Sequence, residues 1–235
     1  MSHPRDARWR AQARTNVWRL GLLVLLGGAW ELATRFGAVN VFWVSSPSRI
    51  VDALIAEANG RGGLDNITAL VEHLGRPDRA FRVVHIAGTN GKGSVTAMVD
   101  AALRAAGYRS ARYTSPHLVD VTERFVIDGR PVAPATLDDA ITAVRASADA
   151  LLADGRLHAP PTYFEVTTAC ALELFRRAGV DVAVLEVGLG GRLDATNATE
   201  PVLSVVTNVG HDHLEVLGPT LKDVAREKAG IFRRS

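Results

Sequence analysis

From residue 64 onward, short apolar runs alternate with longer stretches in which apolar residues recur at helical spacing. Two of the short runs, at residues 181–188 and 202–210, are largely apolar along their length, which is typical of strands buried on both faces of a parallel sheet. Several of the longer stretches end at a glycine, and Thr136 is the expected N-cap of the third one. We predict helices at residues 64–75, 94–107, 136–155, 164–179 and 220–230, and strands at residues 82–88, 110–114, 181–188 and 202–210. Helices that alternate with strands predict an α/β fold with a parallel sheet covered on both faces.

The first 58 residues follow a different pattern. Five arginines among the first 19 residues precede an uncharged run from Leu20 to Trp30, and Glu31 follows it. A bilayer span needs about 20 mostly apolar residues, so this run would be a short span even if it extended to Thr34. The arginines are typical of the cytosolic side of a membrane anchor. A cleavable signal peptide and a buried amphipathic helix are the alternatives, but no convincing cleavage site follows, and we favour membrane contact through residues 17–45.

The net charge of +2 conceals an asymmetry, because the arginine-rich N-terminus leaves the remainder of the chain mildly acidic. The basic isoelectric point therefore gives little support for nucleic-acid binding, which needs a basic face on the folded domain. The single cysteine, Cys170, lies in an apolar helical pattern and excludes a disulfide framework within the chain. We therefore expect a cytoplasmic catalytic body with a buried thiol and no nucleic-acid partner.

The segment VVHIAGTNGKGSVTAM, residues 83–98, joins a predicted strand to a predicted helix through a glycine-rich turn. Such a turn gathers backbone N–H groups and a helix N-terminus around one point, which attracts phosphate. Lys92 would add a positive charge near the β- and γ-phosphates of a nucleotide. The strict phosphate-loop pattern is not met, because Ile86 stands at the first glycine position and Gly93 follows the lysine. The strand-turn-helix context nevertheless favours a phosphate loop over a glycine-rich turn with an exposed lysine.

Candidate metal ligands follow two of the predicted strands. Glu186 lies near the end of the strand at residues 181–188, and His211, Asp212 and His213 follow the next strand. Ligands bind at the C-terminal edge of the strands in open α/β folds, so these side chains should meet there. ATP chemistry needs a hard cation held by oxygen atoms, which favours magnesium. Zinc remains an alternative on these residues alone, although a lone His-x-His without a cysteine partner is weak support for it.

Six motifs occur in one order along residues 62–235 and together resemble one family. They are HIAGTNGKGSV, YTSPHL, TYFEVTTACALELF, VLEVGLGGRLDATN, NVGHDHLEVLG and REKAGIF. In this order and at these spacings they are similar to folylpolyglutamate synthase/dihydrofolate synthase, the folate branch of the Mur ligase family. YTSPHL and EVGLGGRLDATN favour this branch over the peptidoglycan branch. The resemblance implies an α/β, parallel-sheet, P-loop ATP-binding domain of Mur ligase type.

The resemblance also implies an ATP- and Mg²⁺-dependent ligase that adds L-glutamate to dihydropteroate or to the glutamate tail of a folate. A substrate carboxylate would take the γ-phosphoryl group of ATP, and the amino group of glutamate would attack the resulting acyl phosphate. The positions that match the family's phosphate-binding residues are Thr89, Asn90, Gly91, Lys92, Gly93 and Ser94. The positions that match its metal ligands are Ser115, Glu186 and His213. The positions that match its substrate-binding residues are Thr162, Tyr163, Phe164, Leu193, Asp194 and Ala195.

Lys228, in the motif REKAG, matches a lysine that is carbamylated in this family, so the implied catalytic set is Lys92, Glu186, His213 and Lys228. From the residues alone, Lys228 would be a surface lysine near a helix end, where its charge favours the helix dipole. Ser115 would likewise be part of a Ser-Pro turn. The resemblance favours functional roles for both residues.

Residues 15–58 resemble instead the start of an ABC-transporter permease of the nitrate, sulfonate or taurine import type, on LGLLVLLGGAWELATRFG and SSPSRIVDALIAEA. We therefore predict a helical, membrane-associated segment at residues 1–58, a seam at residues 59–66 and an incomplete ligase domain at residues 67–235. The resemblance implies that the family's C-terminal domain is absent, although that domain supplies part of the ATP and glutamate sites. The alternative function is an inactive, membrane-tethered chimera that at most binds nucleotide. A full ligase of this type is expected to be a monomer.

Overall fold

The computed structural model describes residues 18, 21–22, 24–36, 63–157 and 159–232, and the chain forms two compact units, Met1–Ala58 and Asn59–Ser235. In the first unit, residues 24–35 are helical, and an ion pair joins Arg35 to Glu31 one turn earlier. Within the described part of the chain, no helix is both long and apolar enough to cross a membrane. The predicted membrane contact through residues 17–45 therefore finds no support, and part of that range lies outside the described residues. The permease-like segment and the seam stay predictions.

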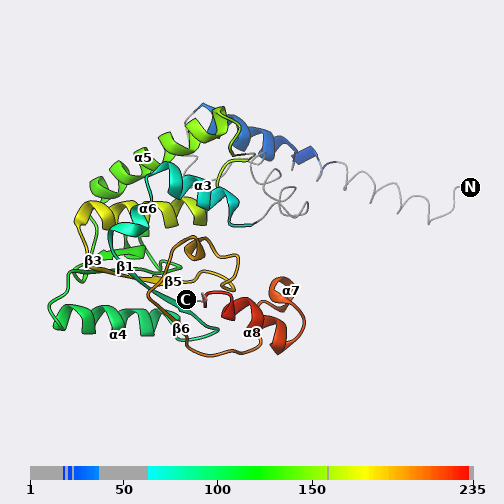
Figure 1. Ribbon diagram of the computed structural model, residues 1–235. Coiled ribbons are helices and arrows are strands. Elements are labelled where there is room, and N and C mark those ends of the chain that lie inside the picture. The colour runs from blue at the N-terminus through cyan, green and yellow to red at the C-terminus, as the bar shows by residue number, and fades with distance from the viewer. Residues whose placement is uncertain (1–17, 19–20, 23, 37–62, 158, 233–235) are drawn as a thin grey trace, which may run out of the picture. The chain divides into compact units, whose positions relative to one another are not determined.

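A six-stranded sheet in the order β4-β3-β2-β5-β1-β6 forms the centre of the second unit (Figure 1). Its strands are β1 (Arg82–Ala87), β2 (Ser110–Tyr113), β3 (Phe125–Ile127), β4 (Arg130–Pro131), β5 (Val182–Glu186) and β6 (Leu203–Val206). Strands β2, β5, β1 and β6 run parallel, as the mostly apolar sequences of β5, β1 and β6 predict. Every residue of the central strand β5 is buried, because helices cover both faces of the sheet.

Strands β3 and β4 correct the prediction of a wholly parallel sheet, because they form an antiparallel hairpin at its edge. β3 pairs antiparallel with β2, and β4 pairs antiparallel with β3. Asp128 and Gly129 have φ values of 49° and 80° and turn the chain between the two strands. An Asp-Gly turn with positive φ suits the twist of hairpin strands. The hairpin escaped prediction because its strands are too short to show an alternating pattern.

Helices lie on both faces of the sheet, with α3, α5 and α6 on one side and α4 on the other (Figure 1). They are α3 (Asp65–His73), α4 (Lys92–Ala105), α5 (Pro134–Ala153), α6 (Tyr163–Ala178), α7 (Leu214–Leu217) and α8 (Leu221–Ala229). Short 3₁₀ turns occur at η1 (Pro77–Ala80), η2 (Val121–Arg124) and η3 (Ala195–Ala198). The sequence predicted the longer helices, but it gave no signal for α7 or for the 3₁₀ turns.

Two helix starts differ from the prediction. Helix α4 begins at Lys92 rather than Ser94, so the phosphate-loop lysine belongs to the first turn of the helix. Helix α5 begins at Pro134 and has Ala133 as its N-cap, so Thr136 lies inside the helix. Proline is well suited to the first helical position, because its φ is already helical and its missing N–H would have had no partner there.

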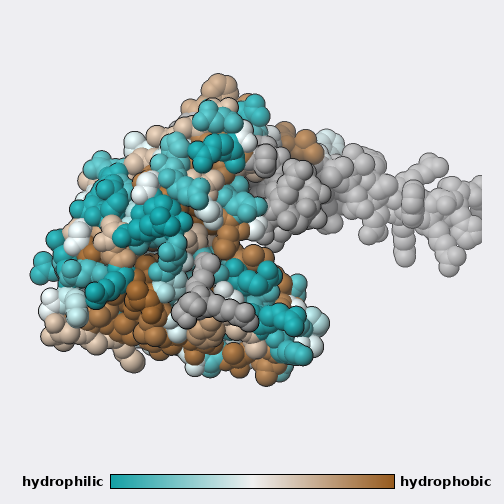
Figure 2. Space-filling model, viewed as in Figure 1, coloured by the Kyte–Doolittle hydropathy of each residue, from teal (hydrophilic) through white to brown (hydrophobic). Residues whose placement is uncertain are grey.

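The hydrophobic core fills the space on both sides of the central strands. Leu172, Leu174 and Phe175 of α6 are at most 1% exposed on one side. On the other side, side chains of β1 and β5 form a cluster against α4 and β6, and its members are Val84, Ile86, Val182 and Val184 with Val95, Val99, Leu103 and Val205. Figure 2 shows apolar surface over the lower part of this unit, where Figure 1 places α4 and β6. The exposed large apolar residues of these two elements include Met98 of α4 and Leu203 of β6.

Candidate functional site

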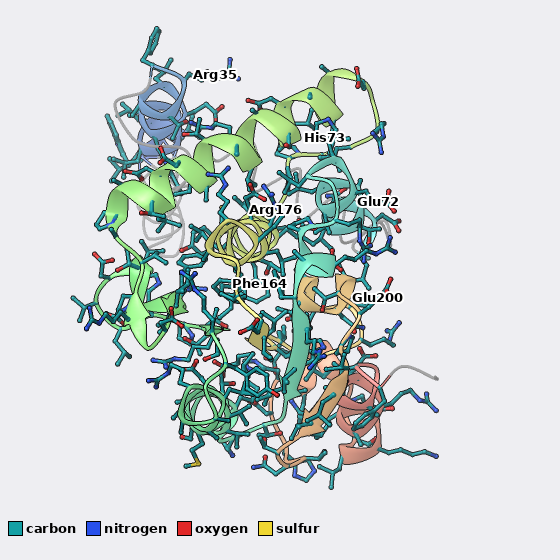
Figure 3. The ribbon with its side chains drawn as sticks, turned by 60° about the vertical axis from the view of Figure 1, so that its left-hand side comes forward. Arg35, Glu72, His73, Phe164, Arg176 and Glu200 are labelled. Carbon is teal, nitrogen blue, oxygen red and sulfur yellow. The ribbon has the colours of Figure 1, made fainter. Side chains whose placement is uncertain are left out.

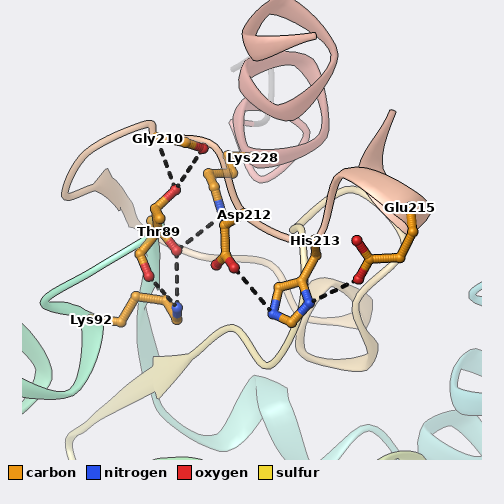
Figure 4. Close-up of polar contacts among 8 residues, drawn as sticks. Thr89, Lys92, Gly210, Asp212, His213, Glu215 and Lys228 are labelled. Carbon is orange, nitrogen blue, oxygen red and sulfur yellow. Dashed lines mark hydrogen bonds and ion pairs between the residues drawn. The ribbon is translucent and has the colours of Figure 1, made fainter. Parts of the chain in front are cut away.

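The glycine-rich turn after β1 forms a closed loop that leads directly into α4. Gly88 and Gly91 have positive φ values of 151° and 78°, and Gly91 is the N-cap of the helix. The side chain of Lys92 folds back over the loop, where Nζ donates hydrogen bonds to the carbonyl oxygens of Gly88 at 2.9 Å and Thr89 at 3.2 Å (Figure 4). The loop, the lysine and the N-terminus of α4 therefore converge at the C-terminal edge of β1, as predicted.

The segment that follows β6 holds this loop in place. The hydroxyl of Thr89 accepts a hydrogen bond from the N–H of Gly210 at 2.9 Å (Figure 4), and the N–H of Thr89 donates to the carbonyl of Asn208. The amide side chain of Asn208 bonds both the N–H and the carbonyl of Asn90, each at 3.0 Å. Thr207 donates to the same Asn90 carbonyl at 2.7 Å. Sequence reasoning missed Thr207 and Asn208, although both follow a strand that ends at this edge of the sheet.

These bonds decide which N–H groups of the loop remain available for a ligand. The N–H of Thr89 donates to the backbone carbonyl of Asn208, and the N–H of Asn90 donates to the Oδ1 atom of the same residue. In the described part of the chain, the N–H groups of residues 91–94 have no acceptor, as expected for the first turn of a helix. Ser94 is exposed in this turn. The anion-binding N–H groups of the loop are therefore those of residues 91–94, and Thr89 and Asn90 fix its shape.

Replacing Gly88 with alanine is expected to distort the loop. A Cβ atom at Gly88 would lie 1.8 Å from Oγ1 of Thr207, and the φ of +151° is one that L-residues rarely adopt. We expect the Gly88→Ala variant to lose about 1–3 kcal/mol of its free energy of unfolding and to lose affinity for ADP. Urea unfolding and an ADP titration measure the two effects.

Gly91→Ala is the matched control for stability. Gly91 also has a positive φ, but a Cβ atom there would meet no other atom within 4 Å. Its cost should be only the conformational strain, about 1 kcal/mol. If the two alanine variants unfold at the same urea concentration, close contact with Thr207 does not shape the loop.

Glu186, the last residue of β5, places a buried carboxylate beside the start of α4. It is 4% exposed, and its Oε2 atom accepts a hydrogen bond from the N–H of Ser115 at 3.2 Å. A Cβ atom at Gly93 would lie 3.6 Å from Oε2, which is ordinary van der Waals contact, so the carboxylate lies against the first turn of α4. Burial raises the pKa of Glu186, and the Ser115 N–H and the charge of Lys92 oppose that rise.

The Glu186 carboxylate has the chemistry of a hard-cation ligand. It forms no ion pair with any described residue and accepts only the one hydrogen bond from Ser115. A buried carboxylate without an ion-pair partner in contact is costly, and a divalent cation bound to its oxygens would reduce that cost. Ser115 lies within reach of the same site, so two of the three predicted metal ligands are adjacent.

His213, the third predicted metal ligand, has ring contacts with acidic residues of its own turn. It has a φ of 50° at the N-cap of α7, and its side chain is half exposed. Its ring nitrogens lie 3.5 Å from a carboxylate oxygen of Asp212 and 3.6 Å from one of Glu215 (Figure 4). The described residues contain no group of three or more histidine, cysteine, aspartate or glutamate side chains arranged around a metal position. The structure therefore brings Ser115 and Glu186 together, while His213 contacts residues of its own turn.

Lys228 lies at the same loop, buried to 3% exposure. Its Nζ donates to the carbonyl oxygen of Gly88 at 3.0 Å, so two lysines, Lys92 and Lys228, share one acceptor (Figure 4). Burial lowers the pKa of Lys228, the positive charge of Lys92 lowers it further, and Asp212 opposes the change. The surface position that the residues alone would favour is therefore wrong.

The start of α6 carries three of the predicted substrate-side residues. Thr162 is the exposed N-cap, and its hydroxyl accepts from the N–H of Glu165 in a reciprocal capping box. The ring of Tyr163 lies under the guanidinium of Arg124, 5.3 Å from its central carbon. Phe164 points from α6 toward the sheet (Figure 3), and its ring centre is 5.9 Å from that of Tyr113.

The other three substrate-side residues lie in the loop after β5. Asp194 is buried and accepts hydrogen bonds from the N–H groups of Leu189 at 2.9 Å and Thr196 at 3.0 Å. Burial raises the pKa of Asp194, and these hydrogen bonds oppose the rise. Ala195 is also buried, and Leu193 is 46% exposed. The Asp194 carboxylate therefore holds the loop, and Leu193 is the side chain of the three that faces solvent.

Known proteins resemble this chain in sequence and in fold. A family model described as the Mur ligase middle domain matches residues 86–235. The dihydrofolate synthase/folylpolyglutamate synthase of Bacillus subtilis is 40% identical over 172 residues, which cover 73% of this chain and 40% of that protein. The chain spans 20–40% of the length of the first curated relatives that it matches.

Two solved structures match the same part of the chain. Escherichia coli FolC in complex with DHPP and ADP superposes with a TM-score of 0.68 at 40% identity, over 74% of this chain and 40% of that one. A bifunctional folylpolyglutamate synthase/dihydrofolate synthase with Mn, AMPPNP and L-glutamate bound superposes with a TM-score of 0.66 at 39% identity, over 73% of this chain and 40% of that one.

Proposed function

This chain belongs to the Mur ligase family, and from that premise we propose that it takes part in ATP-dependent amide synthesis, which joins L-glutamate to dihydropteroate or to a folate tail. The observation that carries the proposal is the convergence of the phosphate loop, Lys92 and the buried Glu186 carboxylate at one sheet edge. Both solved structures are folate ligases that hold an adenine nucleotide or its analogue, and one also holds L-glutamate. Because the chain spans only part of their length, the activity of the whole ligase is part of the proposal.

In this proposal the loop binds the nucleotide phosphates. The N–H groups of residues 91–94 point toward an anion at the N-terminus of α4, and the helix dipole favours negative charge there. When the nucleotide binds, the Nζ group of Lys92 would break its hydrogen bonds to the carbonyl oxygens of Gly88 and Thr89 and contact the phosphates instead. Phosphoryl transfer leaves little covalent chemistry to the protein, so the placing of these charges is most of its contribution.

Glu186 and Ser115 would hold Mg²⁺, with His213 as a further ligand if its turn brings the imidazole to the same ion. When bound, the cation neutralises charge that develops on the transferred phosphoryl group. Glu186 supports this assignment, because its buried carboxylate has no ion-pair partner among the described residues. Tyr163, Phe164 and Leu193 would contact the acceptor substrate, and Thr162 and Asp194 would hold the backbone around it.

We further propose that Lys228 is carbamylated. A carbamate forms when a neutral amine attacks the carbon of CO2: the new N–C bond replaces one C=O π bond, and the nitrogen loses a proton to solvent. Burial and the charge of Lys92 both lower the pKa of Lys228, which favours the neutral amine. The modification would replace two adjacent positive charges with an oppositely charged pair at Gly88. Such a pair favours the charged form of both groups.

The proposal predicts that the purified chain releases ADP from MgATP only when both L-glutamate and dihydropteroate, or both glutamate and a folate, are present. Mass spectrometry of the products should show the new glutamyl amide, and omission of either substrate is the control. A rate of ADP release that is the same with and without both substrates would contradict the ligase assignment. Nucleotide binding without any product would instead support the alternative of a nucleotide-binding chain that does not catalyse ligation.

A further inference from the structure

Arg124 is a buried cation that the site described above does not use. It is the last residue of η2, is 7% exposed, and precedes β3. Its Nε atom donates to Nδ1 of His117 at 2.9 Å, and its guanidinium lies over the ring of Tyr163. These contacts fix the orientation of the side chain. Neither supplies a negative charge, because an imidazole nitrogen that accepts a hydrogen bond adds no counter-charge.

No acidic side chain among the described residues forms an ion pair with Arg124. The acids of its own loop are used elsewhere. Glu123 accepts hydrogen bonds from the N–H groups of Leu118, Val119 and Asp120, at 2.8, 3.1 and 2.9 Å. Asp120 accepts from Thr122. A charge that is buried without a partner is costly, so a guanidinium kept in this state is suited to an anionic ligand.

Arg112 shows the arrangement that the chain uses for an arginine with a structural role. Its Nη1 atom lies 2.7 Å from the carboxylate of Asp100, which is fully buried. Arg124 is more deeply buried than Arg112, whose side chain is 25% exposed, yet it has no such partner. The difference separates Arg124 from the arginines that hold this fold together.

The backbone places Arg124 at the same sheet edge as the phosphate loop. Phe125, the next residue, pairs with Tyr113 at the C-terminal end of β2. The N–H of Thr114 donates to the carbonyl oxygen of Arg124 at 3.1 Å, and Ser115 follows Thr114 and bonds Glu186. Arg124 is therefore joined through its backbone to the segment that carries Ser115, and its side chain contacts the ring of Tyr163.

We propose that Arg124 binds a carboxylate of the pteroyl substrate, an inference that rests on the proposed function. Arginine presents a planar set of N–H donors that matches a carboxylate, and its Nε atom is already occupied by His117. The two Nη groups donate to the ligand in the plane of the guanidinium, while the ring of Tyr163 lies against one face of that plane. The contact orients the acyl group of the substrate toward the phosphate loop.

The test compares two ligands of similar shape, pteroic acid and its primary carboxamide, in the presence of saturating MgADP. The carboxamide has no negative charge and carries an NH2 donor in place of one acceptor oxygen. The wild-type chain should bind the acid more tightly than the amide. Arg124→Gln should bind the acid about ten- to a hundredfold more weakly, as for the loss of a charge-assisted hydrogen bond, and should bind the amide as before. Arg124→Lys, which keeps the charge, should retain part of the preference for the acid.

Arg130→Gln is the matched control, because it removes the same charge from an exposed position on β4. A full preference for the acid in Arg124→Gln would overturn the proposal, and so would an equal loss of affinity for acid and amide. A loss of ADP affinity alone would overturn it too, because the guanidinium would then serve the nucleotide. If the wild type binds ADP but neither pteroyl compound, the proposed substrate class fails as well.

Discussion

Lys92→Ala is expected to weaken binding of ADP and ATP by about ten- to a hundredfold, which is the usual loss of one charge-assisted hydrogen bond. ADP release that depends on glutamate should fall further, by about a hundredfold or more, because Lys92 also stabilises charge on the transferred phosphoryl group. The fold should survive, because Lys92 is only half-buried and donates solely to the loop carbonyls of Gly88 and Thr89. An ADP titration and a coupled assay of ADP release measure the two effects.

Lys222→Ala is the matched control, since it removes a lysine from an exposed position of α8. It should leave both the affinity for ADP and the rate of ADP release unchanged. A Lys92→Met variant keeps the apolar stem and removes only the charge, and it should behave like the alanine variant. Unchanged nucleotide affinity in both Lys92 variants would rule out the phosphate-loop assignment.

The strands and the phosphate loop were predictable because their signals are local. A strand buried on both faces is mostly apolar, and β1 and β5 show this in the sequence, with His85 in β1 and Glu186 at the end of β5 as their buried polar residues. The turn after β1 combines glycines with one lysine and leads into a helix. Glu186 was found for the same reason, because it stands at the end of an apolar strand.

The remaining features of the site depend on contacts between distant parts of the chain. Lys228 is buried because its amine reaches the Gly88 carbonyl, 140 positions away, and its amphipathic helix gives no sign of this. Asn208 fixes Asn90 from 118 positions away. Arg124 has acidic neighbours in sequence, Asp120 and Glu123, which would suggest ion pairs. Only the structure shows that both carboxylates accept hydrogen bonds from backbone N–H groups instead.

Asp100→Ala is expected to lower the free energy of unfolding by about 2–4 kcal/mol. Asp100 is fully buried in α4 and joins that helix to β2. Its carboxylate lies 2.7 Å from Nη1 of Arg112 and 3.4 Å from Nε of Arg104, and it accepts a hydrogen bond from Ser110 at 2.6 Å. Removing one partner of a buried pair costs about 3–5 kcal/mol, and we reduce that range because both arginines reach solvent.

Urea unfolding of Asp100→Ala and Asp100→Asn measures this loss and divides it between charge and hydrogen bonding. The asparagine can still accept a bond from the buried hydroxyl of Ser110, so its loss should be smaller than that of the alanine. Asp139→Ala, at an exposed position of α5, should change the free energy of unfolding by less than about 0.5 kcal/mol. A loss of less than about 1 kcal/mol in Asp100→Ala, with an unchanged dependence on urea, would contradict this prediction. Hydration of the two arginines would then stabilise them as well as their ion pairs with Asp100 do. The attachment of α4 to the sheet, and with it the position of the phosphate loop, would then rest on the apolar cluster formed with β1 and β5.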